Sequence, residues 1–269
     1  MTLTVRKLHP SLGAEVAGVD LRAPVDAETR AALSAALSEH LAIVLRDQSF
    51  APADYLKAAE AFGPVMRQHY SQHNMPDHPD IGVILHRDGQ KPAAMWHTDH
   101  TNRERPPKAT LLWGRAVARG GDTSIANMRA AFAGLDADEQ KRLEGLTTLN
   151  GIDAHRTDVR DADREKYGTP VAHPMVRTHP EHGSKAVYFH ITKAFRIEGM
   201  NEADSRALMQ DLLDRTITPE ITYRHEWRQG DLLIFDNRAT MHRAHGDYDR
   251  SQDRELWRII VQGDRPVLQ

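Results

Sequence analysis

Two histidines and one aspartate form the clearest chemical pattern in this chain. His97 and Asp99 make a His-x-Asp pair, and His242 lies far downstream in Asp-Asn-Arg-Ala-Thr-Met-His. We expect residues 95–101 to form a short strand, in which side chains two positions apart point to the same face. The pair could then bind one metal ion, with a remote histidine as third ligand. Two histidines and a carboxylate, with other metal positions open, suit non-haem Fe(II) oxygen chemistry. A His-x-Asp pair alone is not specific, because the chain has sixteen histidines.

Composition narrows the class of protein. The chain has 269 residues with 40% hydrophobic and 27% charged side chains, which is typical of a globular protein, and we expect one domain over 1–269. The formal net charge of −3 gives no reason to expect binding to nucleic acid or to an anionic membrane. No cysteine is present, so disulfides and thiolate metal sites are excluded. The first residues do not resemble a signal peptide, and no apolar run approaches the length of a membrane span. We therefore expect a cytoplasmic protein.

The order of the expected elements favours a β fold. Short strands are scattered along the chain and a few helices lie between them. The expected strands are 14–20 (an edge strand), 41–45, 81–85, 109–117, 221–227, 232–235, 240–244 and 256–261, and the expected helices are 26–40, 52–62, 129–134, 136–145 and 201–215. This pattern predicts a mainly β fold with helical decoration, a sandwich or jelly roll. Regular strand–helix alternation and a G-x-G-x-x-G turn are both missing, which argues against a dinucleotide-binding sheet.

Two long polar stretches are candidate loops over a site. Residues 66–80 are non-periodic and bounded by prolines, and residues 151–174 are highly charged. Long loops in compact domains often bind ligands or act as lids, so we expect both to be mobile active-site loops. For residues 151–174, a solvent-exposed surface loop with no role at a site is an equally good interpretation.

Arg254 and Arg258 form a second candidate constellation near the C-terminus. Residues four apart on a strand share a face, about 13 Å apart at ~3.3 Å per residue. That separation suits two anionic groups with one guanidinium each, since arginine binds carboxylates in a bidentate manner. The alternatives are two surface arginines or a structural salt bridge.

Taken together, the motifs resemble a known family. The motifs are Trp-His-Thr-Asp, Gly-Gly-Asp-Thr, Gly-Asp-Leu-Leu-Ile-Phe-Asp-Asn-Arg-Ala-Thr-Met-His-Arg and Arg-Glu-Leu-Trp-Arg. They resemble, in order and over nearly the full length, the Fe(II)/2-oxoglutarate-dependent dioxygenases of the taurine dioxygenase and 2,4-dichlorophenoxyacetate dioxygenase (TauD/TfdA) family. The resemblance implies a double-stranded β-helix, which is a jelly-roll variant, and a homo-oligomer, either a dimer or a tetramer.

The resemblance also implies roles for individual residues. His97, Asp99 and His242 would be the iron ligands. Thr123 and Arg254 would bind the distal carboxylate of the co-substrate 2-oxoglutarate. Arg258 would hold the anionic group of the primary substrate. His245 is the rival to His242 as third ligand, and the family pattern Asp-Asn-Arg-x-x-x-His favours His242.

The sequence of the first loop, residues 66–80, differs from that of the corresponding loop in the taurine enzyme. There, a histidine and a tyrosine help to bind the amino-sulfonate, whereas the matching histidine position here carries Gln68. His69 and Tyr70 follow in a different register and are candidate substrate contacts. His100 is another candidate, because it follows the metal-binding aspartate. The departure argues against taurine itself as the substrate.

The implied reaction uses Fe(II), 2-oxoglutarate and O2. It would hydroxylate a small anionic molecule, such as an aryloxyalkanoate, sulfonate, sulfate ester or phosphonate, and release succinate and CO2. Two other functions remain open at this point. A zinc-dependent hydrolase could use the same three ligands but would need a general base that the sequence does not identify. A cupin-like metal-binding module would not need Thr123 and Arg254.

Overall fold

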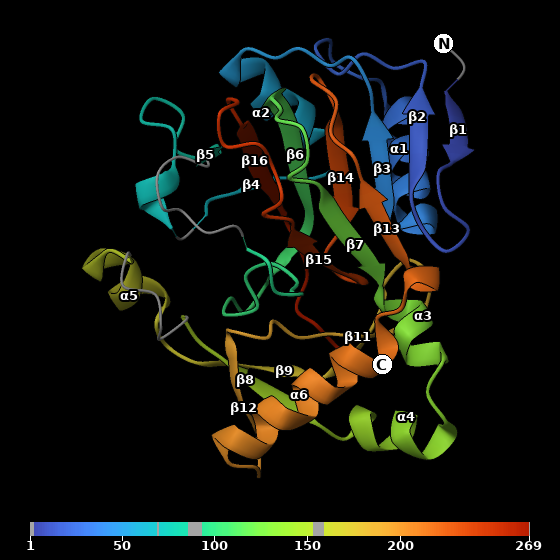
Figure 1. The fold of residues 1–269 in the computed structure, drawn as a ribbon, viewed down its shortest axis with the longest axis vertical. Coiled ribbons are helices and arrows are strands. Elements are labelled where there is room, and N and C mark those ends of the chain that lie inside the picture. Colours follow the sequence, from blue (N-terminus) through green and yellow to red (C-terminus); the bar gives the residue numbers. More distant parts are fainter. Residues whose placement is uncertain (1–2, 69, 86–92, 153–158, 269) are drawn as a thin grey trace.

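The computed structural model describes residues 3–68, 70–85, 93–152 and 159–268, and its centre is one large sheet (Figure 1). The strands come from both halves of the chain, and all neighbours are antiparallel except β2 and β3. In spatial order they are β1 (Thr4–Lys7), β2 (Ala14–Ala17), β3 (Ala42–Leu45), β14 (Leu232–Asp236), β6 (Pro107–Ala116), β16 (Glu255–Gln262) and β4 (Val65–Met66), with β5 (Gly82–Leu85) also paired to β16.

A smaller sheet lies in front of the large one in Figure 1. Its order is β13 (Thr222–His225), β7 (Thr123–Asn127) and β15 (Thr240–Ala244). Apolar side chains of both sheets share one buried cluster, which contains Leu233 and Phe235 from the large sheet and Met241 from the small one. Two facing antiparallel sheets are the arrangement expected of a jelly roll.

The other face of the large sheet is covered by two helices, α1 (Ala27–His40) and α2 (Pro52–Glu60). Strand side chains alternate between the two faces, so Leu232 and Ile234 pack in a second cluster on the helix side, while Leu233 and Phe235 face the small sheet. Asp26 caps the first helix by accepting from the Thr29 amide at 2.7 Å. The alternation of apolar side chains along β14 therefore lets the large sheet pack against the helices on one face and against the small sheet on the other.

A third region lies beside the small sheet, at the lower end of Figure 1. It consists of short strands and helices. They are β8 (Thr147–Asn150), β9 (Val171–Pro174), β10 (Val176–Thr178), β11 (Lys185–Val187), β12 (Ala194–Ile197), α3 (Met128–Ala133), α4 (Ala137–Glu144), α5 (Asp161–Tyr167) and α6 (Glu202–Thr216), with two 3₁₀ turns elsewhere, η1 (Ser71–His73) and η2 (Pro219–Ile221).

The mainly β fold with helical decoration is confirmed, but three local predictions were wrong. Residues 95–101 do not form a strand; within them, only His97 makes isolated bridges. The stretch 151–174 includes α5 and β9, so it is not one continuous loop. The strand that begins at Ala14 is not at the sheet edge, because β1 pairs with its outer side.

A candidate metal and 2-oxoglutarate site

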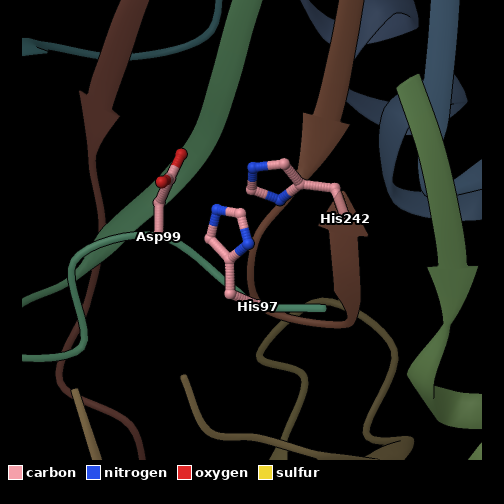
Figure 2. Close-up of side chains that lie close together, drawn as sticks. All are labelled: His97, Asp99 and His242. Atoms are coloured by element: carbon pink, nitrogen blue, oxygen red, sulfur yellow. The ribbon is translucent and has the colours of Figure 1, made fainter. Parts of the chain in front are cut away.

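Three predicted ligands meet at the edge of the small sheet, where His97 is bridged to the middle of β15. Figure 2 shows the side chains of His97, Asp99 and His242 pointing toward one another, and one ligand atom from each lies within 4.8 Å of the others. All three are buried, with 8%, 4% and 8% of their surfaces exposed. The backbone explains this convergence. The amide of His97 donates to the carbonyl of His242 at 3.1 Å, and the reverse bond is 2.8 Å. Residue 97 thus pairs with β15 directly opposite the third ligand.

Asn237 and Thr110 position Asp99. Thr98 donates from its hydroxyl to the Asn237 carbonyl at 2.7 Å, and the Asp99 amide donates to Asn237 Oδ1 at 3.4 Å. The Asp99 carboxylate accepts from Thr110 Oγ1 at 2.6 Å, and that oxygen in turn accepts from Asn237 Nδ2 at 2.8 Å. His100 then turns the chain away with a φ of 49°. Asn237 therefore holds the segment that the sequence suggested was a strand, a role the sequence analysis did not predict.

The protonation states suit a divalent metal. His97 Nδ1 lies 2.7 Å from the Met95 carbonyl, which can only accept, so Nδ1 carries the proton and Nε2 keeps its lone pair. Burial lowers the pKa of His97 and lowers that of His242 to about 3. Burial, the largest single cause, acts to raise the pKa of Asp99, but the charge of Arg258, the two histidines and the hydrogen bond from Thr110 together outweigh it, so the pKa falls below its usual value. At neutral pH the cluster offers two neutral imidazoles and one carboxylate, which fits Fe(II).

Arg254 has the properties expected of a carboxylate anchor. The side chain is only 5% exposed, and its Nη2 donates to the Gly121 carbonyl at 2.7 Å. Its Nη1 is buried without a hydrogen-bond partner among the described residues. Burial lowers the pKa of Arg254, so an anion in contact would stabilise its charge. A buried donor left unpaired costs about 1–3 kcal/mol, which a bound carboxylate would offset.

Thr123 lies on the same sheet face as His242. On β7, Ile125 is directly opposite His242, and Thr123 is two residues along from it. Its hydroxyl is buried and accepts from Trp227 Nε1 at 3.2 Å. Arg254 directly precedes β16 of the large sheet and donates to the carbonyl of Gly121, two residues before Thr123, so the two predicted co-substrate residues lie close together although they come from different sheets.

Gly121 should be needed to keep Arg254 in place. Gly121 has a φ of +69°, and a Cβ there would lie 2.7 Å from Arg254 Nε. Gly183 has a φ of +67° but no atom within 4 Å of its Cβ position, so it is a matched control for backbone strain. We expect both Gly→Ala variants to lose about 1–2 kcal/mol of stability. Only Gly121→Ala should also raise the KM for 2-oxoglutarate, by about tenfold, through a disturbed charge-assisted bond. Equal KM values in the two variants would contradict this role.

Arg258 lies beside the carboxylate of the candidate metal site. Its Nη1 is 3.8 Å from Asp99 Oδ1. The buried amide of Gln68 holds the guanidinium, because Gln68 Oε1 accepts from Arg258 Nε at 2.6 Å and Gln68 Nε2 donates to the Arg258 carbonyl at 3.0 Å. The amide fits only because residue 82 is glycine, where a Cβ would lie 2.6 Å from Gln68 Nε2. Gln68 thus orients a neighbouring cation.

The structure also places most of the other residues that the sequence suggested for substrate or metal binding. Tyr70 and His100 are buried, and their ring centroids are 6.3 Å apart, so Tyr70 lies beside the residue that follows Asp99. His69 lies outside the described residues. His245 Nε2 lies 2.8 Å from Ser124 Oγ, so the rival third ligand is turned toward another partner.

The two predicted loops touch each other. Ser71 in the first loop donates from its hydroxyl to Asp163 Oδ2 at 2.7 Å, and its amide lies 3.2 Å from the same oxygen. Asp163 belongs to α5, in the second stretch. The two segments are therefore in direct contact.

Comparison with known proteins agrees with this geometry. Residues 4–260 match the family model described as taurine catabolism dioxygenase TauD, TfdA family. The chain belongs to the TauD/TfdA family. It is 30% identical to an alpha-ketoglutarate-dependent 2,4-dichlorophenoxyacetate dioxygenase of Cupriavidus pinatubonensis, over 99% of this chain and 100% of the relative. It is 32% identical to an alpha-ketoglutarate-dependent sulfate ester dioxygenase of Pseudomonas putida, over 99% and 92%.

A solved structure in the TauD/TfdA family has the same fold. The crystal structure of AAD-2 in complex with Mn(II) and N-oxalylglycine superposes with a TM-score of 0.84 at 30% identity, covering 99% of both chains. The predicted jelly roll and the predicted enzyme class are confirmed. The chain is an Fe(II)- and 2-oxoglutarate-dependent dioxygenase, which uses O2 as the oxidant.

Proposed function

We propose that this dioxygenase hydroxylates a small anionic organic molecule and releases succinate and CO2. The observation that carries the proposal is the position of Arg258, whose guanidinium lies 3.8 Å from a carboxylate oxygen of the metal-binding cluster. An anion bound to this guanidinium would lie next to the metal. When bound, Fe(II) supplies the oxidation chemistry together with O2 and 2-oxoglutarate, and the protein supplies position and charge.

The residues of the chain divide this work. His97, Asp99 and His242 would hold Fe(II), and their burial keeps water from the reacting centre. Arg254 and Thr123 would hold the distal carboxylate of 2-oxoglutarate. Three protein ligands leave room on the metal for the co-substrate and O2.

The substrate class follows from charge and from the relatives. Proteins similar to this chain are named for 2,4-dichlorophenoxyacetate, (S)-phenoxypropionate and sulfate esters, and one is an alkylsulfatase. All of these substrates carry a small anionic group. We propose that the substrate here is an aryloxyalkanoate, sulfonate, sulfate ester or phosphonate whose anionic group pairs with Arg258.

A substrate panel tests the proposed reaction. The protein is incubated with Fe(II), ascorbate and 2-oxoglutarate, while O2 consumption and succinate are measured with each anionic candidate. We expect at least one to stimulate both in equal amounts. Hydrolysis of a candidate without O2 consumption would instead support a metal-dependent hydrolase. Metal binding without any turnover over a broad panel would support a cupin-like binding module.

The two arginines should have separable effects. Each forms charge-assisted bonds that are worth about 1.5–3 kcal/mol, so each loss should change an affinity about tenfold to a hundredfold. We expect Arg254→Ala mainly to raise the KM for 2-oxoglutarate and Arg258→Ala mainly to raise the KM for the primary substrate. Steady-state kinetics with each substrate varied in turn measures both effects. The reverse assignment of the two effects would show that their roles are exchanged.

Assembly and location are further proposals. Among the described residues, no helix has the length and apolar character needed to cross a membrane. We propose a single dioxygenase domain over 1–269, with the segments near 66–80 and 151–174 closing over the site. We also propose a homo-oligomer, either a dimer or a tetramer, in the cytoplasm.

A further inference from the structure

A second buried cation, Lys193, lies on the His97 side of the metal-binding cluster. It follows a tight turn in which the amides of Lys193 and Ala194 both donate to the His190 carbonyl, at 3.0 and 2.8 Å. His190 forms an isolated bridge with His97, and their ring centroids are 4.8 Å apart. The turn that carries Lys193 is therefore fixed to a metal-binding residue.

Tyr70 holds the ammonium group in this position. Lys193 Nζ donates to the Tyr70 hydroxyl at 2.5 Å and lies 4.6 Å from the centre of the same ring. Only 4% of the Lys193 surface is exposed, and lysine is rarely so buried because its charge is costly to desolvate. The charges of Lys193 and Arg258 both act to lower the pKa of His97, so both cations lie within electrostatic reach of the same ligand.

One short segment orients both cations. Gln68 accepts from Arg258 Nε at 2.6 Å, and two residues later Tyr70 accepts from Lys193 at 2.5 Å. Arg258 comes from β16, and Lys193 comes from the turn between β11 and β12. The two cations thus come from different parts of the fold: Arg258 lies beside Asp99, and Lys193 belongs to the turn whose His190 is bridged to His97.

This arrangement distinguishes between shapes of anion. A planar carboxylate has two oxygens, which one guanidinium can bind in a bidentate manner. A sulfonate, sulfate ester or phosphonate has three terminal oxygens that point in three directions, so it can contact two cations that approach from different sides. Nε of Arg258 donates to Gln68, so a substrate anion would contact the η nitrogens, of which Nη1 lies 3.8 Å from Asp99 Oδ1.

We propose that Lys193 is a second anchor for the substrate anion, and that the enzyme prefers tetrahedral oxyanions over carboxylates of the same carbon skeleton. The inference rests on the proposed function, in which Arg258 binds the anion next to the metal. It narrows the substrate class from any small anion to sulfonates, sulfate esters and phosphonates.

Matched ligand pairs test the preference without turnover. Hexanesulfonate is compared with heptanoate, and phenoxymethanesulfonate with phenoxyacetate, by calorimetric titration into protein loaded with Mn(II) and N-oxalylglycine. We expect the wild type to bind the sulfonate of at least one pair about tenfold more tightly, as expected for one additional charge-assisted contact. Lys193→Met should remove this preference and leave carboxylate binding within about twofold. Tyr70→Phe, which removes only the hydroxyl, should reduce the preference in part, whereas Arg258→Ala should weaken both ligands of a pair.

Two results would contradict the role proposed for Lys193. Equal affinity of the wild type for both members of each pair, including no binding of either, would overturn the proposal. So would an equal loss for both ligands in Lys193→Met, because that is the effect of a structural lysine. If thermal unfolding shows that Lys193→Met does not fold, the decision rests on Tyr70→Phe, whose selective loss of sulfonate affinity supports the proposal and whose unchanged preference overturns it. The succinate assay is separate, so absence of turnover with a retained binding preference would reject the proposed function and keep the role of Lys193.

Discussion

Replacing His242 with alanine should abolish metal-dependent succinate formation. His242 is the ligand contributed by β15, and without it the cluster retains only the neighbouring His97 and Asp99. Loss of an outer-shell partner of a metal ligand typically costs 10–100-fold in affinity or activity, so loss of a ligand should cost at least about 100-fold. Both Mn(II) affinity, measured by calorimetry, and the rate of succinate formation should fall.

His245 provides the matched control. It lies three residues further along, and its ring contacts Ser124 instead of the cluster. We expect His245→Ala to keep activity within about twofold of the wild type, as is usual for substitutions away from special sites. Wild-type metal binding in His242→Ala, or its loss in His245→Ala, would show that the third ligand has been assigned to the wrong histidine.

Replacing Asp236 with asparagine should destabilise the fold strongly. Asp236 ends β14, is fully buried, and leads directly into the turn before β15. Its carboxylate accepts from Arg238 Nε at 2.9 Å and Nη2 at 2.5 Å, and it lies 3.1 Å from His179 Nε2. Burial, the largest single cause, acts to raise the pKa of Asp236, but the charge and hydrogen bonds of Arg238 together with His179 outweigh it and keep the carboxylate ionised. Removing one charge of a buried pair costs about 3–5 kcal/mol, because the other is left uncompensated.

An exposed aspartate shows whether burial causes this cost. Asp211 pairs with Arg215 on α6 at 2.8 Å, but its side chain is 61% exposed. We expect Asp211→Asn to change the free energy of unfolding by less than about 1 kcal/mol, since exposed ion pairs contribute little. Urea denaturation of both variants gives the comparison. Similar changes in the two proteins would contradict the structural role assigned to the buried pair.

Local sequence signals predicted most of the elements around the site. Asp26 caps α1 as expected, and β15 has the predicted bounds Thr240–Ala244. These succeeded because a capping side chain and an alternating apolar run act over a few residues. The small strand β1 was missed, since its four residues are all exposed and carry no apolar alternation.

The segment that contains His97 and Asp99 shows where local reasoning fails. The His-x-Asp spacing suggested a strand, whereas the structure has one bridged residue followed by a turn. The convergence of the two side chains depends on Asn237, which is 138 positions away from Asp99. A contact of that separation leaves no periodic pattern. The three side chains that converge were nevertheless proposed as ligands from the sequence, because the residue types and the family motifs pointed to them independently of the backbone.

Of the cations at the candidate site, the sequence pointed to the two arginines but not to the lysine, again because a long-range contact leaves no local signal. Arg254 and Arg258 stood out as a pair on one strand. Lys193 did not, because a lysine in a polar turn looks like a surface residue until Tyr70, 123 positions earlier, is found beside it. Gln68 was visible only as a departure from the taurine enzyme, and its contact with Arg258 gives that departure a physical meaning.

Anomalous diffraction from crystals grown with Mn(II) and N-oxalylglycine tests the metal centre most directly. We expect one strong manganese peak at bonding distance from the side chains of His97, Asp99 and His242, with the distal carboxylate of the analogue paired with Arg254. A manganese peak elsewhere, or one that His242 does not contact, would contradict it.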